Sequence, residues 1–214
     1  MESEAHSNWR LLHGSAFVVL MAGAMLIPEL RRWPWMWIVP LAGYFLMAVF
    51  LPRWRSAMIW LRVGKLSGVS IAATVGIMTL TSATLVAFNT IAKPDVSNYR
   101  AALPFERFGG VITAGVVFTV VNATLEELVF RGVLFDAIGS QWNVWVTLIA
   151  TSVLFGLGHL HGFPPGLWGA CLAVVFGFGV GVLRVWTGGL ALPILAHMGA
   201  DSTIYWILVS GGAL

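Results

Sequence analysis

Six polar residues that could do chemistry lie within or beside apolar stretches of the last ninety residues. They are Glu126, Glu127, Arg131, His159, His197 and Asp201. A charged side chain at mid-membrane costs about 2.5–3.5 kcal/mol on insertion scales, so ionisable residues in apolar spans mark functional sites by default. Because polar groups in lipid must satisfy one another, we expect these six to converge on one buried pocket.

The two adjacent glutamates have unequal partners. At about 100° per residue in a helix, Glu127 and Arg131 share one face as an acid-first i,i+4 pair. Glu126 points elsewhere, with Asn122 one turn before it. Glu127 is therefore expected to stay ionised, while Glu126 has no cation on its own helix and is available as a base. A charge cluster that only closes a helix bundle is the alternative that this stretch leaves open.

Two further apolar stretches carry histidine. His159 closes Phe155-Gly-Leu-Gly-His159, and a lone histidine there is also compatible with a packing role. His197 and Asp201 are again four residues apart, so their side chains leave one helix face roughly 6 Å apart along the axis. This pair could orient the imidazole, bind a metal or polarise a carbonyl, and an interhelical hydrogen bond is the simpler alternative.

The composition indicates that these stretches lie in a membrane. Of the 214 residues, 58% are hydrophobic and 10% charged, whereas soluble domains have roughly 45–50% apolar and about 25% charged residues. So few charges cannot cover a folded surface in water. The net charge of +3 comes from basic residues between apolar stretches, with no basic run of interleaved aromatics, which excludes a nucleic-acid partner.

The expected fold is all-α, a polytopic transmembrane helix bundle with a polar cavity between the helices that carry the motifs. A span takes about 20 apolar residues, which predicts seven spans near 11–28, 34–51, 67–92, 109–135, 143–160, 167–185 and 189–210. Residues 54–65 predict an interfacial helix, which would make eight helices. The apolar runs of the first ninety residues hold essentially no polar group.

Two patterns predict how the spans are placed. Gly169, Ala173, Gly177 and Gly181 recur every four residues and predict close approach of a neighbouring helix. Tryptophans gather at the predicted span ends and predict an aromatic belt at the headgroup level. They include Trp33, Trp35, Trp37, Trp54, Trp60, Trp142, Trp145, Trp168 and Trp186.

Three motifs in order carry a family resemblance. Glu126-Glu127-x-x-x-Arg131, Phe155-x-x-x-His159 and His197-x-x-x-Asp201 stand on separate apolar segments. Together they resemble the CAAX-protease and bacteriocin-processing family (CPBP, or Abi), the glutamic intramembrane endopeptidases of the CAAX prenyl protease type II kind. The similarity covers about residues 109–206, which divides the chain into N-terminal spans with the interfacial helix (1–108) and a catalytic membrane core (109–214).

The resemblance implies peptide-bond hydrolysis by a glutamate-activated water. Glu126 would be the general base, and His159 would hold and activate the water. His197 and the residue at 201 would stabilise the oxyanion. The family often has Asn at this last position; an ionised Asp201 cannot donate a hydrogen bond, so it is either protonated or orients His197.

Four neighbouring residues would shape the site rather than react. They are Glu127, Arg131, Asn122 and Phe155. Other intramembrane protease chemistries are poorly supported, since His-Glu-x-x-His and the serine and aspartyl protease motifs are absent. No cofactor is expected. Zinc held by Glu126, His159 and His197 is the alternative, because two histidines and a carboxylate form a known catalytic ligand set.

The expected partners are the lipid bilayer and a membrane-associated protein or peptide, either lipidated or with a hydrophobic C-terminal tail, in a prokaryotic inner membrane. CAAX-type, bacteriocin-related and C-terminal sorting-tail processing all fit. The alternatives are a non-catalytic peptide-binding or immunity protein and a proton-coupled transporter. A transporter would often show interrupted helices in two matching halves, whereas the intramembrane charge here is confined to the C-terminal half.

Overall fold

The computed structural model describes residues 2–103 and 109–212, and within these ranges every regular element is a helix. In chain order the elements are α1 (Glu2–Met25), η1 (Pro28–Arg31), α2 (Trp35–Phe50), α3 (Pro52–Ala57), α4 (Gly68–Ala92), α5 (Ser97–Ala101), α6 (Val111–Glu127), the π-helical η3 (Leu128–Leu134), α7 (Phe135–Gly139), α8 (Val144–Gly158), α9 (Gly166–Thr187) and α10 (Ala191–Val209). The predicted all-α class is confirmed.

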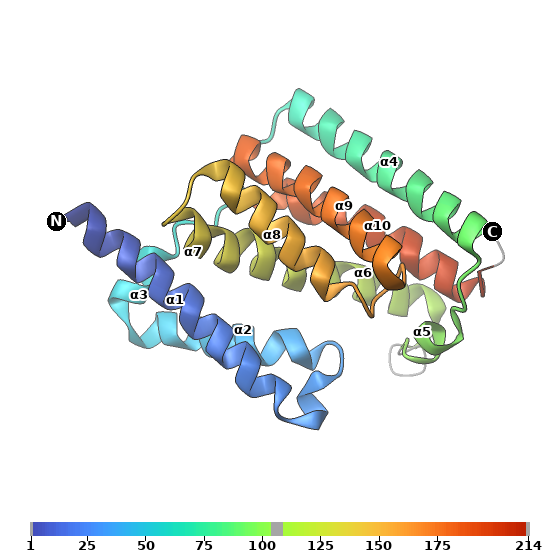
Figure 1. The fold of residues 1–214 in the computed structure, drawn as a ribbon, viewed down its shortest axis with the longest axis horizontal. Helices are drawn as coiled ribbons and strands as arrows, with labels where there is room; N and C mark the ends of the chain where they lie inside the picture. Colours follow the sequence, from blue (N-terminus) through green and yellow to red (C-terminus); the bar gives the residue numbers. More distant parts are fainter. Residues whose placement is uncertain (1, 104–108, 213–214) are drawn as a thin grey trace.

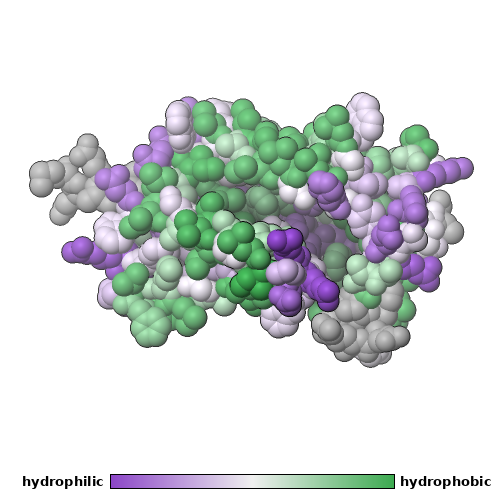
Figure 2. All heavy atoms as spheres, turned by 60° about the horizontal axis from the view of Figure 1, so that its bottom comes forward, coloured by the Kyte–Doolittle hydropathy of each residue, from purple (hydrophilic) through white to green (hydrophobic). Residues whose placement is uncertain are grey.

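Each of the seven predicted spans is a helix. Four helical stretches are long and apolar enough to cross a membrane, namely Gly68–Ala92, Val111–Gly139, Gly166–Thr187 and Ala191–Val209, and α2 and α8 are shorter apolar helices. The first predicted span, α1, is outside this set because the polar residues in its first half lower the mean hydropathy of the helix. Hydrophobic residues cover much of the face in Figure 2. The chain is a polytopic helical membrane protein.

The helices that carry the motifs lie side by side between two flanking parts. In Figure 1, α8, α9, α10 and α6 form the middle of the bundle, with α4 along one side and α1, α2 and α3 on the other. The small-residue stripe of α9 is approached closely by another helix, as predicted, and the structure shows that this helix is α8. A Cβ on Gly181 would lie 2.8 Å from Leu148 Cδ2, and one on Gly177 would lie 3.3 Å from Phe155. The stripe thus sets how closely α8 and α9 approach.

The interfacial helix predicted over residues 54–65 is wrong in extent. Helix α3 ends at Ala57, and the chain continues without helix to Ser67. Gly64, with a φ of 92°, is incompatible with a right-handed helix. The backbone instead bonds to the α9–α10 turn: Leu190 N donates to Arg62 O at 2.8 Å, and Lys65 N donates to Thr187 O at 2.8 Å. This segment therefore joins the N-terminal part to the motif helices.

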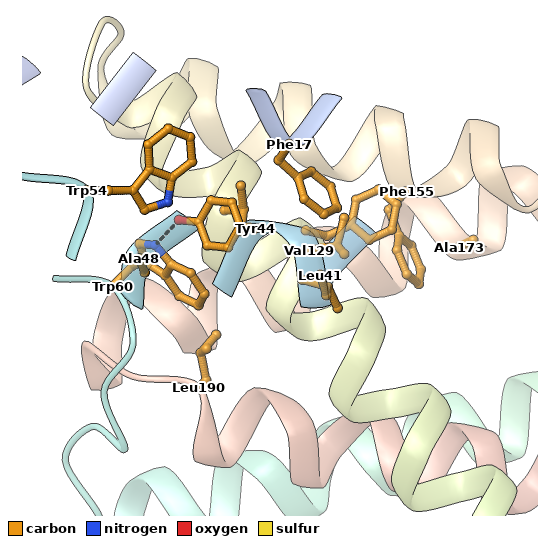
Figure 3. Packing of buried hydrophobic residues seen from close by; sticks show 12 residues of the cluster. Phe17, Leu41, Tyr44, Ala48, Trp54, Trp60, Val129, Phe155, Ala173 and Leu190 are labelled. Atoms are coloured by element: carbon orange, nitrogen blue, oxygen red, sulfur yellow. Dashed lines mark hydrogen bonds between the residues drawn. The ribbon is translucent and has the colours of Figure 1, made fainter. Parts of the chain in front are cut away.

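Two of the tryptophans assigned to an aromatic belt lie in the core. Trp54 and Trp60 are 3% and 1% exposed and pack around Tyr44, to which Trp60 Nε1 donates at 3.3 Å (Figure 3). Phe17 and Phe155 belong to the same cluster. The belt prediction fails for these two tryptophans because the short helix α3 and the segment after it fold back onto α2. The N-terminal helices thereby pack on the motif helices.

Candidate active site

Glu127 is the most firmly held carboxylate of the motifs. Its Oε1 accepts a hydrogen bond from Arg131 Nη1 at 2.9 Å and another from His197 Nδ1 at 2.8 Å. Glu127 and Arg131 are 0% and 1% exposed. The predicted Glu127–Arg131 pair is therefore present. The bond from His197 was not predicted, and it ties α10 to the end of α6.

Arg131 connects three helices around this pair. Its Nη2 donates to Gly177 O of α9 at 3.0 Å, and its guanidinium lies over the Phe155 ring of α8 at 4.5 Å. A Cβ at Gly177 would stand 3.1 Å from that nitrogen, so the glycine leaves room for the guanidinium. Arg131 itself lies in η3, whose π-helical turn directly follows the two glutamates. Single-turn π segments inside helices are frequent at functional sites.

Glu126 has fewer hydrogen-bond partners than Glu127. Its Oε2 is buried and accepts no hydrogen bond from any residue that the structure describes. Its nearest charged partner is His197 Nε2, at 3.6 Å, which is beyond a normal N–H···O hydrogen bond. Glu127 Oε2 is also unpartnered, but the other oxygen of that carboxylate has two donors. Of the two glutamates, Glu127 thus has two hydrogen-bond donors, whereas the buried Oε2 of Glu126 has none among the described residues.

Two successive hydrogen bonds connect Asp201 to the N-terminal part of the chain. Trp33 Nε1 donates to Asn122 Oδ1 at 3.0 Å, and Asn122 Nδ2 donates to Asp201 Oδ2 at 3.2 Å. An indole N–H can only donate, so it fixes the oxygen of Asn122 toward Trp33 and the amide NH₂ toward Asp201. Asp201 Oδ1 lies 3.7 Å from His197 Nε2. Sequence reasoning missed Trp33, because nothing local distinguishes it from the other tryptophans.

His159 lies where α8 ends and has a defined tautomer. Its Nδ1 is 2.9 Å from Phe155 O. A carbonyl only accepts, so Nδ1 carries the hydrogen and Nε2 of the neutral ring is an acceptor. The Phe155 ring packs against both histidines, with centroid distances of 4.3 Å to His159 and 5.7 Å to His197. Phe155 thus separates and orients the two imidazoles, in keeping with its predicted shaping role.

A cavity of about 420 Å³ opens between α4, α8, α9 and α10. His159, His197 and Asp201 line it, while most of the other lining residues, such as Leu80 and Phe176, are apolar. The expected polar cavity between the motif helices is not what the structure shows: this cavity is mainly apolar, α4 and α9 supply much of its lining, and no residue of α6 lines it. Glu126 is not among the lining residues and reaches the cavity's edge through its contact with His197. The predicted site residues thus form one neighbourhood, with His159 joined through Phe155 and the cavity.

The predicted zinc ligands do not form a metal centre in this arrangement. Among the described residues, no group of three or more His, Cys, Asp and Glu side chains is placed to hold a metal ion. His197 Nδ1 is bonded to Glu127, and His159 Nδ1 to a backbone carbonyl, which leaves Nε2 of each ring available, as in metal-binding histidines. What the arrangement lacks is the convergence of Glu126, His159 and His197 on one point, so as it stands this donor set does not fit zinc.

The comparisons with known proteins agree with the motifs. Residues 108–203 match the family model described as "Type II CAAX prenyl endopeptidase Rce1-like". This range contains every residue that the sequence assigned to the site. No solved structure matches the chain.

Two curated relatives match parts of the chain. An Escherichia coli protein named "Uncharacterized 24.3 kDa protein" is 37% identical over 79 residues, which are 36% of this chain and 36% of the relative. The Bacillus subtilis (strain 168) protein named "Putative membrane peptidase YdiL" is 30% identical over 83 residues, 39% of this chain and 32% of the relative. The matches span about a third of each relative's length. By its motifs and the family match, the segment 108–203 is similar to the Rce1-like family of type II CAAX prenyl endopeptidases.

Proposed function

We propose that the protein is an intramembrane endopeptidase in which Glu126 activates a water molecule for attack on a peptide bond. The observation that carries this proposal is the difference between the two adjacent glutamates. Glu127 is fixed by Arg131 and His197, whereas Glu126 has a buried, unpartnered oxygen next to the same histidine. One fixed and one available carboxylate is the division of roles that proton-transfer chemistry needs.

The reaction would proceed by addition and elimination. Glu126 takes one proton from water as the water oxygen bonds to the scissile carbonyl carbon, and His159 Nε2 accepts a hydrogen bond from the O–H that remains. The negative charge moves to the former carbonyl oxygen. Collapse breaks the C–N bond, and Glu126 returns its proton to the leaving amine.

His197 is the proposed donor to the oxyanion. Its Nδ1 already donates to Glu127, so a second donation requires a hydrogen on Nε2 as well. Glu126 and Asp201 face Nε2 at 3.6 and 3.7 Å and compensate the positive charge of a doubly protonated ring. Asp201 would then act through His197, with Asn122 holding its other oxygen. This favours the orienting role of Asp201 over direct donation.

The substrate we propose is a hydrophobic segment of a membrane-associated protein or peptide, lipidated or with an apolar C-terminal tail. The cavity beside His159 and His197 is lined mainly by aliphatic and aromatic side chains of α4 and α9, which suits such a segment better than a polar peptide. A prokaryotic inner membrane is the proposed location. Prenylated tails, bacteriocin-related peptides and sorting tails all satisfy this chemistry.

Terminal-peptide mass spectrometry of host membranes tests the activity. The comparison is between wild type, a deletion strain, and the deletion complemented with Glu126→Gln or with the matched control Glu29→Gln, an exposed glutamate outside the site. We expect a terminus that is present with wild type and Glu29→Gln and absent in the deletion and with Glu126→Gln. If Glu126→Gln restored every terminus, a carboxylate base would be excluded and a peptide-binding or transport role would replace it.

Metal dependence needs its own measurement. We expect the purified protein to keep full activity in a strong chelator with no metal retained. Loss of activity in chelator that added zinc restores would show that His159 and His197 rearrange around a metal and would replace the metal-free mechanism.

A further inference from the structure

A second cavity, of about 360 Å³, lies away from the active site at one end of the bundle. Gly139 at the end of α7, Val144 at the beginning of α8 and Gly188 just after α9 line it. Since these helices are apolar, their ends lie toward a membrane surface. Four charged residues also line this cavity, which we call the arginine pocket: Arg10, Arg62, Asp136 and Arg184.

The arginine pocket has more positive than negative charge. Its three arginines and one aspartate give a net charge of +2. Asp136 forms an ion pair with Arg10, whose Nε and Nη2 donate to its two carboxylate oxygens at 3.0 and 2.6 Å. Among the side chains that the structure describes, neither Arg62 nor Arg184 lies within ion-pair distance of a carboxylate. Asp136 is therefore the single carboxylate in a lining that holds three guanidinium groups.

Arg184 is held in place with donors to spare. Its Nε donates to Arg131 O at 3.2 Å and its Nη2 donates to Trp60 O at 3.3 Å. Both acceptors are neutral carbonyls, so they position the guanidinium without cancelling its charge. A guanidinium has five N–H groups, and three of those of Arg184 remain for a ligand. Arg62, in the segment that follows α3, is exposed and also lines the pocket.

The surroundings of the pocket suit a lipid headgroup. Trp142, which lines the pocket, is 63% exposed, and Trp145 at the beginning of α8 and Trp186 near the end of α9 are exposed at the same end. Exposed tryptophans mark the headgroup level of a bilayer. Basic pockets between helices at this level bind anionic headgroups, and arginine forks match the geometry of phosphate oxygens.

We propose that the arginine pocket binds a phosphate group through Arg62 and Arg184, supplied by an anionic phospholipid or as free phosphate. The test is thermal unfolding of the purified, delipidated chain in a neutral sugar detergent. Three probes are titrated separately: phosphatidylglycerol, inorganic phosphate and diacylglycerol, which has no phosphate. The variants are Arg62→Gln and the matched control Arg55→Gln, an exposed arginine outside the pocket.

We expect phosphatidylglycerol to raise the unfolding temperature of wild type and Arg55→Gln alike, and diacylglycerol to have no effect. Arg62→Gln should weaken the apparent affinity by about tenfold or more, as loss of a charged hydrogen bond does. Stabilisation by inorganic phosphate at similar concentration would support the pocket with free phosphate as the source. Equal binding to Arg62→Gln and wild type, equal effects of diacylglycerol, or no response to either phosphate probe would overturn the proposal.

Discussion

The protein buries two polar clusters that are built on opposite charge balances. In the active-site cluster, three carboxylates (Glu126, Glu127 and Asp201) share Arg131 and His197. In the end cluster (Arg10, His13, Tyr44 and Asp136), a single carboxylate has two partners. Asp136 bonds Arg10 and lies 3.4 Å from His13 Nε2, whose other nitrogen meets Tyr44 Oη at 2.9 Å.

This contrast supports the proposed division between a reactive cluster and a structural one. A buried carboxylate is tolerated when it is paired and hydrogen-bonded, and Asp136 satisfies that condition. Glu126 does not, because its buried oxygen has no donor among the described residues. The proposed proton-transfer function would explain why this oxygen is left without a donor. The end cluster has no such group on its carboxylate and fastens α1 to α7.

The largest effect should follow from removing the available carboxylate. We expect Glu126→Gln to lower the rate of substrate processing by about 10²–10⁴-fold, the usual contribution of a general base. Its stability should stay equal or rise, because an isosteric amide replaces an unpaired carboxylate. Rate assays and SDS unfolding of the purified variant measure the two effects. A processing rate within a few fold of wild type would remove Glu126 from the mechanism.

Removing the cation should instead destabilise the active-site cluster. Arg131→Met leaves three carboxylates against His197 alone, and breaking a buried ion pair in this way costs about 3–5 kcal/mol. The SDS unfolding midpoint measures the loss. The double variant Glu127→Gln with Arg131→Met should recover part of it, because the orphaned charge is then absent. A double variant as unstable as the sum of both single variants would show that Glu127 and Arg131 are not coupled.

The end cluster should respond only in stability. Asp136→Asn removes the charge that holds Arg10 and His13, so we expect a loss of about 1.5–3 kcal/mol, the range for hydrogen bonds to charged groups. The processing rate of the folded variant should stay near that of wild type. Asp95→Asn, at an exposed aspartate, is the matched control and should change neither quantity. A rate that fell in proportion to stability would contradict the separation of the two clusters.

The parts of this arrangement that follow from local spacing were predictable. Apolar runs of span length indicated the seven helices, and four-residue spacing indicated the Glu127–Arg131 pair and the close approach of another helix to the glycine stripe. The π-helical turn of η3 was not predictable, because no residue type demands it. The bond from His197 to Glu127 was not predictable either, because i,i+4 spacing within one helix does not indicate which residues of another helix it contacts.

The end cluster is a second case in which contacts between helices could not be predicted from local spacing. The expectation that the apolar runs of the first ninety residues hold essentially no polar group is wrong. His13 in the first run is fully buried against Tyr44 and Asp136, and α4 buries Ser70, Thr74 and Asn89. The partners of His13 are supplied by α2 and α7, far along the chain, and a lone histidine in an apolar run carries no signal of them. Trp54 and Trp60 were misplaced for the same reason. A tryptophan next to arginines resembles an interfacial residue until the segment is seen to fold inward.

The smallest effect tests whether the N-terminal part serves the active-site cluster. Trp33→Phe keeps an aromatic ring but removes the N–H that fixes the Asn122 amide. One lost hydrogen bond is worth about 1 kcal/mol, so we expect the processing rate to fall by about fivefold, measured on the purified variant beside Trp35→Phe, whose ring is exposed.

If the loss acts through Asn122, then adding Trp33→Phe to Asn122→Ala should not lower the processing rate further, because the amide that Trp33 orients is already gone. Independent losses in the two variants would instead mean that Trp33 acts on packing alone. In that case the reactive cluster would be confined to the motif helices, and its separation from the N-terminal part would be complete.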